Sequence, residues 1–415
     1  MDTTVERHLL ERSNPLGRGL SVVYPEYDGY CIANIPDLIA SFLGTAEVAD
    51  PWADIARQGA GVERIVFLLL DGFGYRKAQQ LFAAFPDAAL KGLADRGRGL
   101  PLTSVYPSTT VSALTSLSTG LTPLEHGMIG YRLYLRETAT ITNMIRFSTV
   151  GNPTPESVFA LGLDRETLFP HETIHQRLVR EGIAVHSILP GHIANSGLST
   201  ALYRGCATQH AAVSLPDMFA RTREILNTTT GKTFVSLYWP GLDSVAHVVG
   251  PDSPSYRDEF LAIDDALRRG LIGEVEDTLL IVTADHGFVP MTPEDYVLLD
   301  GEFDAGNALL MPPVGEPRAS YLFTRNGGRD LVRPAFSDER SDGLVCLEAA
   351  ELLETHLLGV GTPHPEVAHR IGDLALLSTG HAGTFQDYPD AALLRGMHGG
   401  LTEDEMLVPL IVGAL

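Results

Sequence analysis

Cysteine is scarce in this chain of 415 residues, and the three cysteines present lie far apart in the sequence. They are Cys31, Cys206 and Cys346, and none of them belongs to a CxxC pair. This spacing argues against a disulfide framework and against a zinc site built from thiolates. Isolated cysteines fit a reducing compartment, so we expect a cytoplasmic protein.

Long apolar runs are also missing from the sequence. No stretch approaches the roughly 18 consecutive apolar residues that a membrane-spanning helix needs. Residues 1–19 contain no apolar segment of the kind that secretory signals carry. We therefore expect no membrane-embedded part and no export signal.

Basic residues are few compared with acidic ones. The chain has 30 Lys and Arg against 52 Asp and Glu, which gives a formal net charge of −22. Such a protein is repelled by the phosphate backbone of nucleic acids and by anionic membrane surfaces. We therefore expect neither a nucleic-acid polymer nor a membrane as a partner. The acidic residues are scattered in short clusters, which is typical of a solvated surface.

Three apolar segments, each followed closely by an acidic residue, have the character of strands buried on both faces. They span residues 64–70, 233–238 and 278–283. Such runs are typical of parallel sheets that are covered by helices. Because ligands collect at the carboxyl ends of parallel strands, the polar residues that follow these runs are expected to meet at one edge of the sheet.

Six carboxylate or imidazole side chains are expected at this edge. They are Asp71, Asp243, His247, Asp285, His286 and His398. Asp243 and His247 are four residues apart, so both side chains would point the same way on a helix. Carboxylate and imidazole without thiolate suit zinc and, less selectively, manganese or iron. Six groups exceed what one catalytic zinc ion takes, so we expect two divalent metal ions, Zn²⁺ first and Mn²⁺ as the alternative.

A segment rich in hydroxyl groups, residues 105–130, carries the expected nucleophile. A short helix is predicted from Val111 to Thr119, with Thr109 or Thr110 at its N-terminus and Gly120 in the left-handed position after it. The unpaired N–H groups of a helix start stabilise an anion such as a phosphoryl group beside the threonine hydroxyl. A plain capped helix is the alternative, which the acids and histidines elsewhere in the chain disfavour.

Taken together and in this order, these motifs resemble those of the alkaline phosphatase superfamily. The segments are Leu-Asp71-Gly, Pro-Ser-Thr-Thr110, Asp243-x-x-x-His247, Ala-Asp285-His286-Gly and Met-His398-Gly-Gly. The similarity runs from Ile65 to Pro409. Within the superfamily, the chain looks most like the type I phosphodiesterase and nucleotide pyrophosphatase family.

The resemblance implies two metal sites and one nucleophile. One site would contain Asp71, Thr110, Asp285 and His286, and the other would contain Asp243, His247 and His398. Thr110 would attack phosphorus and form a phosphothreonine intermediate, which water then hydrolyses. The expected partner is a small phosphate ester or a nucleotide.

Two departures from the family pattern leave the substrate class open. The family usually has Phe-Pro-Asn after the nucleophile, whereas residues 111–113 here are Val-Ser-Ala. The phosphate-binding asparagine of the family falls on Tyr131. The phenol of Tyr131 and the guanidinium of Arg132 could contact phosphate oxygens instead, so we expect both to bind substrate. Packing or surface exposure is the alternative for both residues.

The expected function is hydrolysis of phosphodiester or pyrophosphate bonds in a small substrate, with nucleotides as one candidate class. A phosphomonoesterase and a metal-dependent phosphomutase of the same superfamily are the alternatives among enzymes. A non-catalytic metal-binding or anion-binding protein is the alternative outside enzymes.

The predicted fold is α/β, with three layers (α/β/α) around a central, mostly parallel sheet. Residues 1–288 and 396–415 are expected to form the phosphoesterase core, and residues 289–395 an inserted cap subdomain. Within this insertion, a helix is predicted from Cys346 to Leu357.

Overall fold

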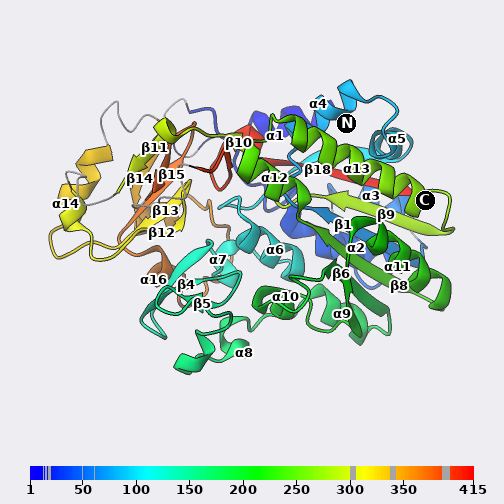
Figure 1. Cartoon of the computed structure of the whole chain (residues 1–415), viewed down its shortest axis with the longest axis horizontal. Coiled ribbons are helices and arrows are strands. Elements are labelled where there is room, and N and C mark those ends of the chain that lie inside the picture. Colours follow the sequence, from blue (N-terminus) through cyan, green and yellow to red (C-terminus); the bar gives the residue numbers. More distant parts are fainter. Residues whose placement is uncertain are drawn as a thin grey trace.

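The computed structural model describes most of the chain, and the account below is confined to this part. The described residues are 1–12, 14, 16, 20–48, 50–59, 61–299, 305–336, 343–385 and 393–415. They form two seven-stranded sheets, one in each lobe of an elongated molecule (Figure 1).

The first sheet is the core of the larger lobe, and its strand order is β2-β18-β9-β1-β8-β6-β7. Its strands are β1 (Arg64–Leu70), β2 (Arg98–Thr103), β6 (Ala184–Pro190), β7 (Thr208–Ala212), β8 (Thr233–Trp239), β9 (Thr278–Thr283) and β18 (Leu407–Ala414). The five strands from β9 to β7 pair in parallel, and β18 is antiparallel to both of its neighbours. The predicted central, mostly parallel sheet is confirmed.

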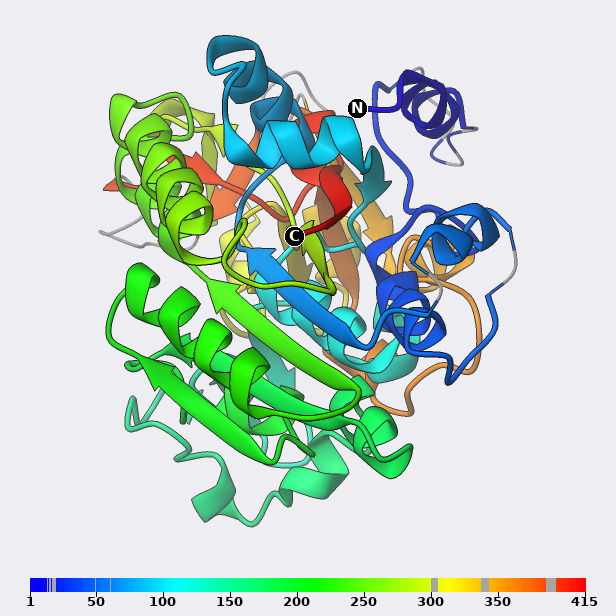
Figure 2. The same cartoon turned by 90° about the vertical axis from the view of Figure 1, so that its right-hand side faces the viewer.

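Helices cover both faces of this sheet, which completes the predicted three layers (Figure 2). One group of packed helices comprises α4 (Tyr75–Ala84), α5 (Ala89–Arg96), α11 (Leu215–Thr228), α12 (Gly241–Val249), α13 (Pro254–Gly270) and α17 (Glu403–Met406). The other group comprises α2 (Ile35–Phe42), α6 (Thr110–Thr119), α7 (Pro123–His126), α9 (Ile174–Arg180) and α10 (Gly197–Leu202). Because helices cover both faces, β8 and β9 are buried along almost their whole length and consist mainly of apolar residues.

The second sheet is antiparallel and forms the smaller lobe, with the order β14-β15-β13-β12-β3-β4-β5. Its strands are β3 (Arg132–Leu135), β4 (Thr140–Asn143), β5 (Ser148–Thr149), β12 (Val314–Glu316), β13 (Ala319–Leu322), β14 (Leu344–Glu348) and β15 (Leu374–Ser378). Three of these strands come from residues 132–149, outside the proposed insertion 289–395. The boundaries of that insertion stay a prediction, and parts of it lie outside the described residues.

Short elements complete the described chain. The two-stranded pairs are β10 (Val289–Pro290) with β17 (Gly396–Met397), and β11 (Tyr296–Leu298) with β16 (Gly383–Phe385). The remaining α-helices are α1 (Thr3–Leu10), α3 (Ala53–Gln58), α8 (Arg165–Leu168), α14 (Arg329–Val332), α15 (Ala349–Glu354) and α16 (Val367–Ile371). None of the described helices combines the length and the apolar character that crossing a bilayer requires.

The helix predicted from Cys346 to Leu357 is wrong in its first residues. Cys346 lies in β14, where it is paired with Leu376 of β15. The helix α15 begins only at Ala349, after Glu348 and Glu351 form a reciprocal capping box. Pairing with β15 satisfies the backbone of residues 344–348, and this long-range contact overrides the local helical pattern.

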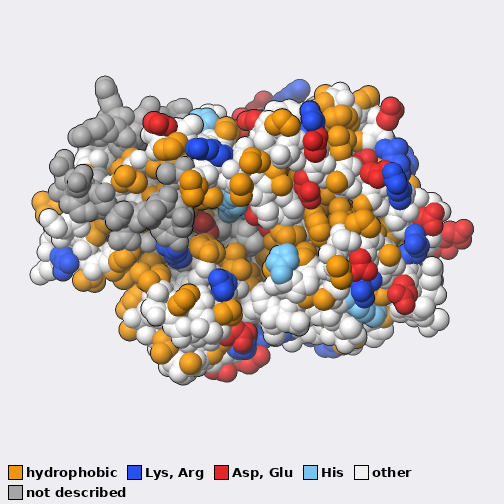
Figure 3. Space-filling view, viewed as in Figure 1, with side chains coloured by type: hydrophobic (Ala, Val, Ile, Leu, Met, Phe, Trp, Pro, Cys, Tyr) orange, Lys and Arg blue, Asp and Glu red, His pale blue; other side chains and the backbone are white. Residues whose placement is uncertain are grey.

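Charged side chains are spread over the molecular surface. Among the described residues on the face shown in Figure 3, acidic and basic side chains are intermingled, and most lie over the larger lobe. This distribution agrees with the expectation that the acidic excess is mainly a solvated surface.

A fully buried ion pair joins the two lobes. Arg318, between β12 and β13, contacts both carboxylate oxygens of Glu405 in α17, at 2.5 and 2.8 Å. Both side chains have no exposed surface. The guanidinium also donates to the carbonyl oxygens of Gly380 and Ala382, so its charge is well compensated.

Arg318→Met is expected to lower the free energy of unfolding by about 3–5 kcal/mol, because Glu405 would stay buried without its ionic partner. Arg329→Met is the matched control, since Arg329 is half exposed and pairs with Glu348 and Asp373 at the surface. The control should cost only about 0–1 kcal/mol. Urea unfolding followed by circular dichroism measures both, and equal losses would contradict the prediction.

Candidate active site and metal centre

The start of helix α6 carries the expected nucleophile. The helix runs from Thr110 to Thr119, Thr109 is its N-cap, and Gly120 follows in the left-handed conformation with φ 77°. Within the described structure, the Thr109 side chain makes no capping hydrogen bond. Its hydroxyl donates instead to the carboxylate of Glu316. The first N–H groups of α6 are therefore not taken by this side chain and can receive an anion.

All six predicted acids and histidines meet at the carboxyl edge of the first sheet. Asp71 follows β1, Asp285 follows β9, and His398 follows β17. Asp243 and His247 lie one turn apart on α12, directly after β8, and their Oδ1 and Nε2 atoms are 3.4 Å apart. Four segments that are distant in the sequence thus contribute to one cluster.

Two groups of side chains in this cluster have the spacing of metal ligands. One group is Asp71, Asp285 and His286, and the other is Asp243, His286 and His398. The resemblance implied that His286 belongs to one metal site only. In the structure His286 is a member of both groups. Its ring stacks on that of His398, with 3.7 Å between the ring centroids. His247 belongs to neither group among the described residues but adjoins Asp243.

The three carboxylates in the cluster are suited to hold cations. Asp71 Oδ1, Asp243 Oδ1 and Asp285 Oδ2 are buried and have no hydrogen-bond partner among the described residues. A buried carboxylate oxygen without a partner is costly, and a divalent cation removes that cost by coordination. The donor set therefore fits the two metal ions that the sequence predicts.

The three histidines are oriented by backbone carbonyl groups. His247 Nδ1 lies 2.9 Å from the oxygen of Gly396, His286 Nδ1 lies 3.1 Å from that of Gly287, and His398 Nδ1 lies 3.1 Å from that of Ser108. Because a carbonyl oxygen only accepts, each Nδ1 must carry the proton to make this bond. Each Nε2 is then left with a lone pair, which is the arrangement of a metal-ligating histidine.

The concentration of negative charge shifts the pKa values of the cluster. Burial raises the pKa of Asp71 well above its ordinary value, and the charges of Asp243 and Asp285 raise it further. Burial also opposes ionisation of Asp243, but the adjacent His247 holds the pKa of Asp243 below its ordinary value. Burial lowers the pKa of His398 well below its usual range, which favours the neutral, ligating form.

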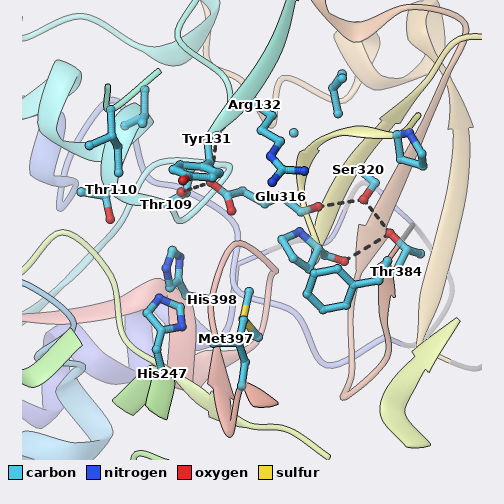
Figure 4. Close-up of a pocket in the computed structure, with 18 of the residues that line it drawn as sticks. Thr109, Thr110, Tyr131, Arg132, His247, Glu316, Ser320, Thr384, Met397 and His398 are labelled. Carbon is cyan, nitrogen blue, oxygen red and sulfur yellow. Dashed lines mark hydrogen bonds between the residues drawn. The ribbon is translucent and has the colours of Figure 1, made fainter. Parts of the chain in front are cut away.

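Thr110 faces a cavity of about 500 Å³ beside this cluster. The Thr110 hydroxyl oxygen lies 3.3 Å from His286 Nε2. Figure 4 shows His247 and His398 on one side of the cavity and Tyr131, Arg132 and Glu316 on the other. A phosphorus group in this cavity would therefore lie between Thr110 and the second lobe.

Tyr131 and Arg132, the predicted substrate-binding residues, line the same cavity. The Tyr131 N–H donates to Glu316 over 2.9 Å, and its phenol oxygen accepts a hydrogen bond from Asn143. Arg132 begins β3 and is paired in register with Asn143 of β4 and Gly315 of β12. Contact of either side chain with substrate stays a prediction.

Two residues of the site were not anticipated from the sequence. Tyr238, near the end of β8, donates its hydroxyl to Asp71 Oδ2. Glu316 reaches the cavity from β12. Tyr238 belongs to an apolar run and Glu316 to a short hairpin without a motif, so the sequence carries no signal for either role.

Solved structures with a similar fold include enzymes that act on phosphorus compounds. Murine ectonucleotide pyrophosphatase/phosphodiesterase 5 is 16% identical, with a TM-score of 0.63, covering 84% of this chain and 88% of its own. Phosphonoacetate hydrolase from Sinorhizobium meliloti, in complex with phosphonoformate, is 21% identical, with a TM-score of 0.63, covering 85% of this chain and 90% of its own. At these identities the likeness shows a shared fold.

The family is established by a match along the sequence. No curated protein sequence matches the chain. The model of the family described as type I phosphodiesterase/nucleotide pyrophosphatase matches residues 65–338, which is more than half of the chain. This chain therefore belongs to the type I phosphodiesterase/nucleotide pyrophosphatase family, and the expectation of a hydrolase of this metal-dependent type is confirmed at that level.

Proposed function

We propose that the protein hydrolyses phosphodiester or pyrophosphate bonds of a small substrate through a phosphothreonine intermediate on Thr110. The observation that carries this proposal is the position of Thr110 at the start of α6, beside His286 and the two groups of metal-ligand spacing. The cavity in front of Thr110 has room for a small organic substituent as well as a phosphoryl group.

We further propose that two divalent ions, Zn²⁺ or alternatively Mn²⁺, bind in this cluster. The proposed ligands are Asp71, Thr110, Asp243, His247, Asp285, His286 and His398. When bound, such ions lower the pKa of the threonine hydroxyl and offset negative charge around phosphorus. The carboxylate oxygens without a hydrogen-bond partner among the described residues, and the histidine Nε2 atoms that are left with a lone pair, support this assignment.

Residues of the chain account for the remaining steps. The Thr110 oxygen forms a bond to phosphorus while the bond from phosphorus to the leaving oxygen breaks, and that oxygen takes up a proton. Water then attacks the phosphothreonine, which releases the phosphate product and restores the hydroxyl. The N–H groups at the start of α6 stabilise a phosphoryl oxygen, and Tyr131 and Arg132 are the proposed contacts for the others.

The comparisons agree with a small phosphorus-containing substrate. One solved structure with this fold is an inactive variant of murine ectonucleotide pyrophosphatase/phosphodiesterase 5 in complex with AMP. The bacterial phosphonoacetate hydrolase has been solved with phosphonoacetate as well as with phosphonoformate. These ligands are of the size that the cavity admits.

Hydrolysis of bis-p-nitrophenyl phosphate should exceed that of p-nitrophenyl phosphate when the protein is loaded with Zn²⁺ or Mn²⁺. The expected preference follows from the proposed diesterase activity, and release of p-nitrophenolate measures both rates. A preference for the monoester would indicate a phosphatase in which Arg132 binds the additional charge. Hydrolysis of neither ester by metal-loaded protein would contradict the proposal and favour a phosphomutase.

Thr110→Ala should reduce kcat/KM for the preferred ester by at least about 1,000-fold, because the attacking oxygen is lost. Metal content should change little, since the hydroxyl is only one of several ligands. Thr109→Ser is the matched control, because it keeps the neighbouring hydroxyl while altering the same helix start. Activity retained in Thr110→Ala would place the nucleophile elsewhere.

Asp243→Asn and His398→Ala should each lower bound metal and activity together, because each removes one proposed ligand. Metal per protein is measured by mass spectrometry after dialysis against a dilute chelator. His192→Ala serves as the control, since His192 is exposed and belongs to neither group with metal-ligand spacing among the described residues. Unchanged metal content in both ligand variants would contradict the proposed assignment.

A further inference from the structure

A buried carboxyl group that the proposed reaction does not use lies in the wall of the cavity. Glu316 is the last residue of β12, and only 7% of it is exposed. Its Oε1 atom accepts hydrogen bonds from the Thr109 hydroxyl and from the Tyr131 N–H. In Figure 4 the side chain extends towards Thr109, and the other carboxyl oxygen faces the cavity on the side of His398.

The contacts of Oε1 do not require a carboxyl group. A glutamine has a carbonyl oxygen that accepts the same two hydrogen bonds without carrying charge. The groups of described residues with metal-ligand spacing do not include Glu316, so metal binding does not explain the acid either. Pro313, Val314 and Pro317 lie on one side of Glu316 in the lining of the cavity, and Arg132 belongs to the same lining. Burial raises the pKa of Glu316 to about 7, although its two hydrogen bonds and the charge of Arg132 act in the opposite direction.

A carboxyl group in this position must affect which substrates enter. A phosphorus substrate is anionic, so an additional acid in the same cavity is unfavourable unless the substrate offers that acid a polar hydrogen. A hydroxyl or an ammonium group on the organic substituent provides such a hydrogen. A carboxylate on the substituent offers no hydrogen to donate to Glu316. Where both carboxyl groups are ionised, they also repel each other.

We propose that Glu316 determines specificity by accepting a hydrogen bond from a hydroxyl or ammonium group on the organic substituent of the substrate. Substrates whose substituent carries a carboxylate are rejected by the same oxygen. This inference rests on the proposed function, and it narrows the substrate class to phosphate esters of alcohols that carry a further hydrogen-bond donor.

A matched series of p-nitrophenyl phosphodiesters tests the inference. The second ester group is propyl, 3-hydroxypropyl, 3-aminopropyl or 2-carboxyethyl, and each rate is corrected for release without protein. The hydroxypropyl and aminopropyl esters should exceed the propyl ester in kcat/KM by about 10-fold or more, because each donates a hydrogen bond to a charged or strongly polar acceptor. The carboxyethyl ester should be the poorest substrate.

Glu316→Gln should lower the aminopropyl-to-propyl ratio of kcat/KM by about 10-fold, because the amide keeps the two hydrogen bonds of Oε1 but loses the charge that an ammonium group would meet. Glu294→Gln is the matched control, since this exposed acid lies in the same stretch of chain and should leave every ratio unchanged. A purely structural role of Glu316 would lower all four rates together. Unaltered ratios in Glu316→Gln would overturn the inference.

Affinities separate a failure of this inference from a failure of the proposed function. Calorimetry with metal-loaded Thr110→Ala gives the dissociation constants of the four esters. Because this variant should not cleave them, the constants measure the preference for each substituent independently of turnover. If wild-type protein cleaves none of the esters, the proposed function is wrong, and the order of affinities still tests Glu316. Equal affinities for all four esters would overturn the inference even if Glu316→Gln fails to fold.

Discussion

The buried ion pair between Arg318 and Glu405 is the contact on which the geometry of the site depends. The carboxylate of Glu405 accepts a hydrogen bond from the N–H of Gly400, and the backbone carbonyl oxygen of Glu405 accepts one from the N–H of Gly287. These glycines follow His398 and His286 closely in the sequence, so one residue fixes both histidine loops. Arg318 belongs to the hairpin that begins with β12, so the same pair fixes the second lobe against those loops. The same ion pair therefore holds the two lobes against each other and holds the loops of His286 and His398 in place.

The cluster beside Thr110 is costly for a protein without bound cations. Three buried carboxylate oxygens have no hydrogen-bond partner among the described residues, and the pKa of Asp71 is raised by burial and by its acidic neighbours. Such an arrangement persists only when the surrounding fold enforces it. The parallel strands β1 and β9 enforce it here, because their pairing in register holds Asp71 and Asp285 at the same edge. The unfavourable burial of these carboxylates is what the proposed binding of metal ions would offset.

The sequence predicted the parts of the site that depend on local pattern. Continuous apolar runs predicted the strands that end before Asp71 and Asp285. The start and stop residues of α6 predicted Thr109 or Thr110 at its N-terminus. The second lobe was harder, because β12 has three residues and its position depends on pairing with β3 and β13. No local pattern reports that Glu316 lies beside Thr109, which is 207 residues away. Long-range pairing likewise placed residues 346–348 in a strand where a helix was predicted.

The hydrogen bond between Thr109 and Glu316 links the residue before the proposed nucleophile, Thr110, to the lobe that faces it. An N-cap threonine ordinarily uses its hydroxyl to satisfy the helix, but here that hydroxyl donates to β12, and the helix start is left for an anion. The same hydrogen bond holds Glu316 in a fixed position, with its second oxygen towards the cavity. The proposed metal ligands come from the larger lobe and from the loop after β17, whereas Glu316 comes from the smaller lobe. Under the proposal, a change of Glu316 alters the accepted substituent, whereas a change of Arg318 in the same hairpin also disturbs the loops that carry His286 and His398.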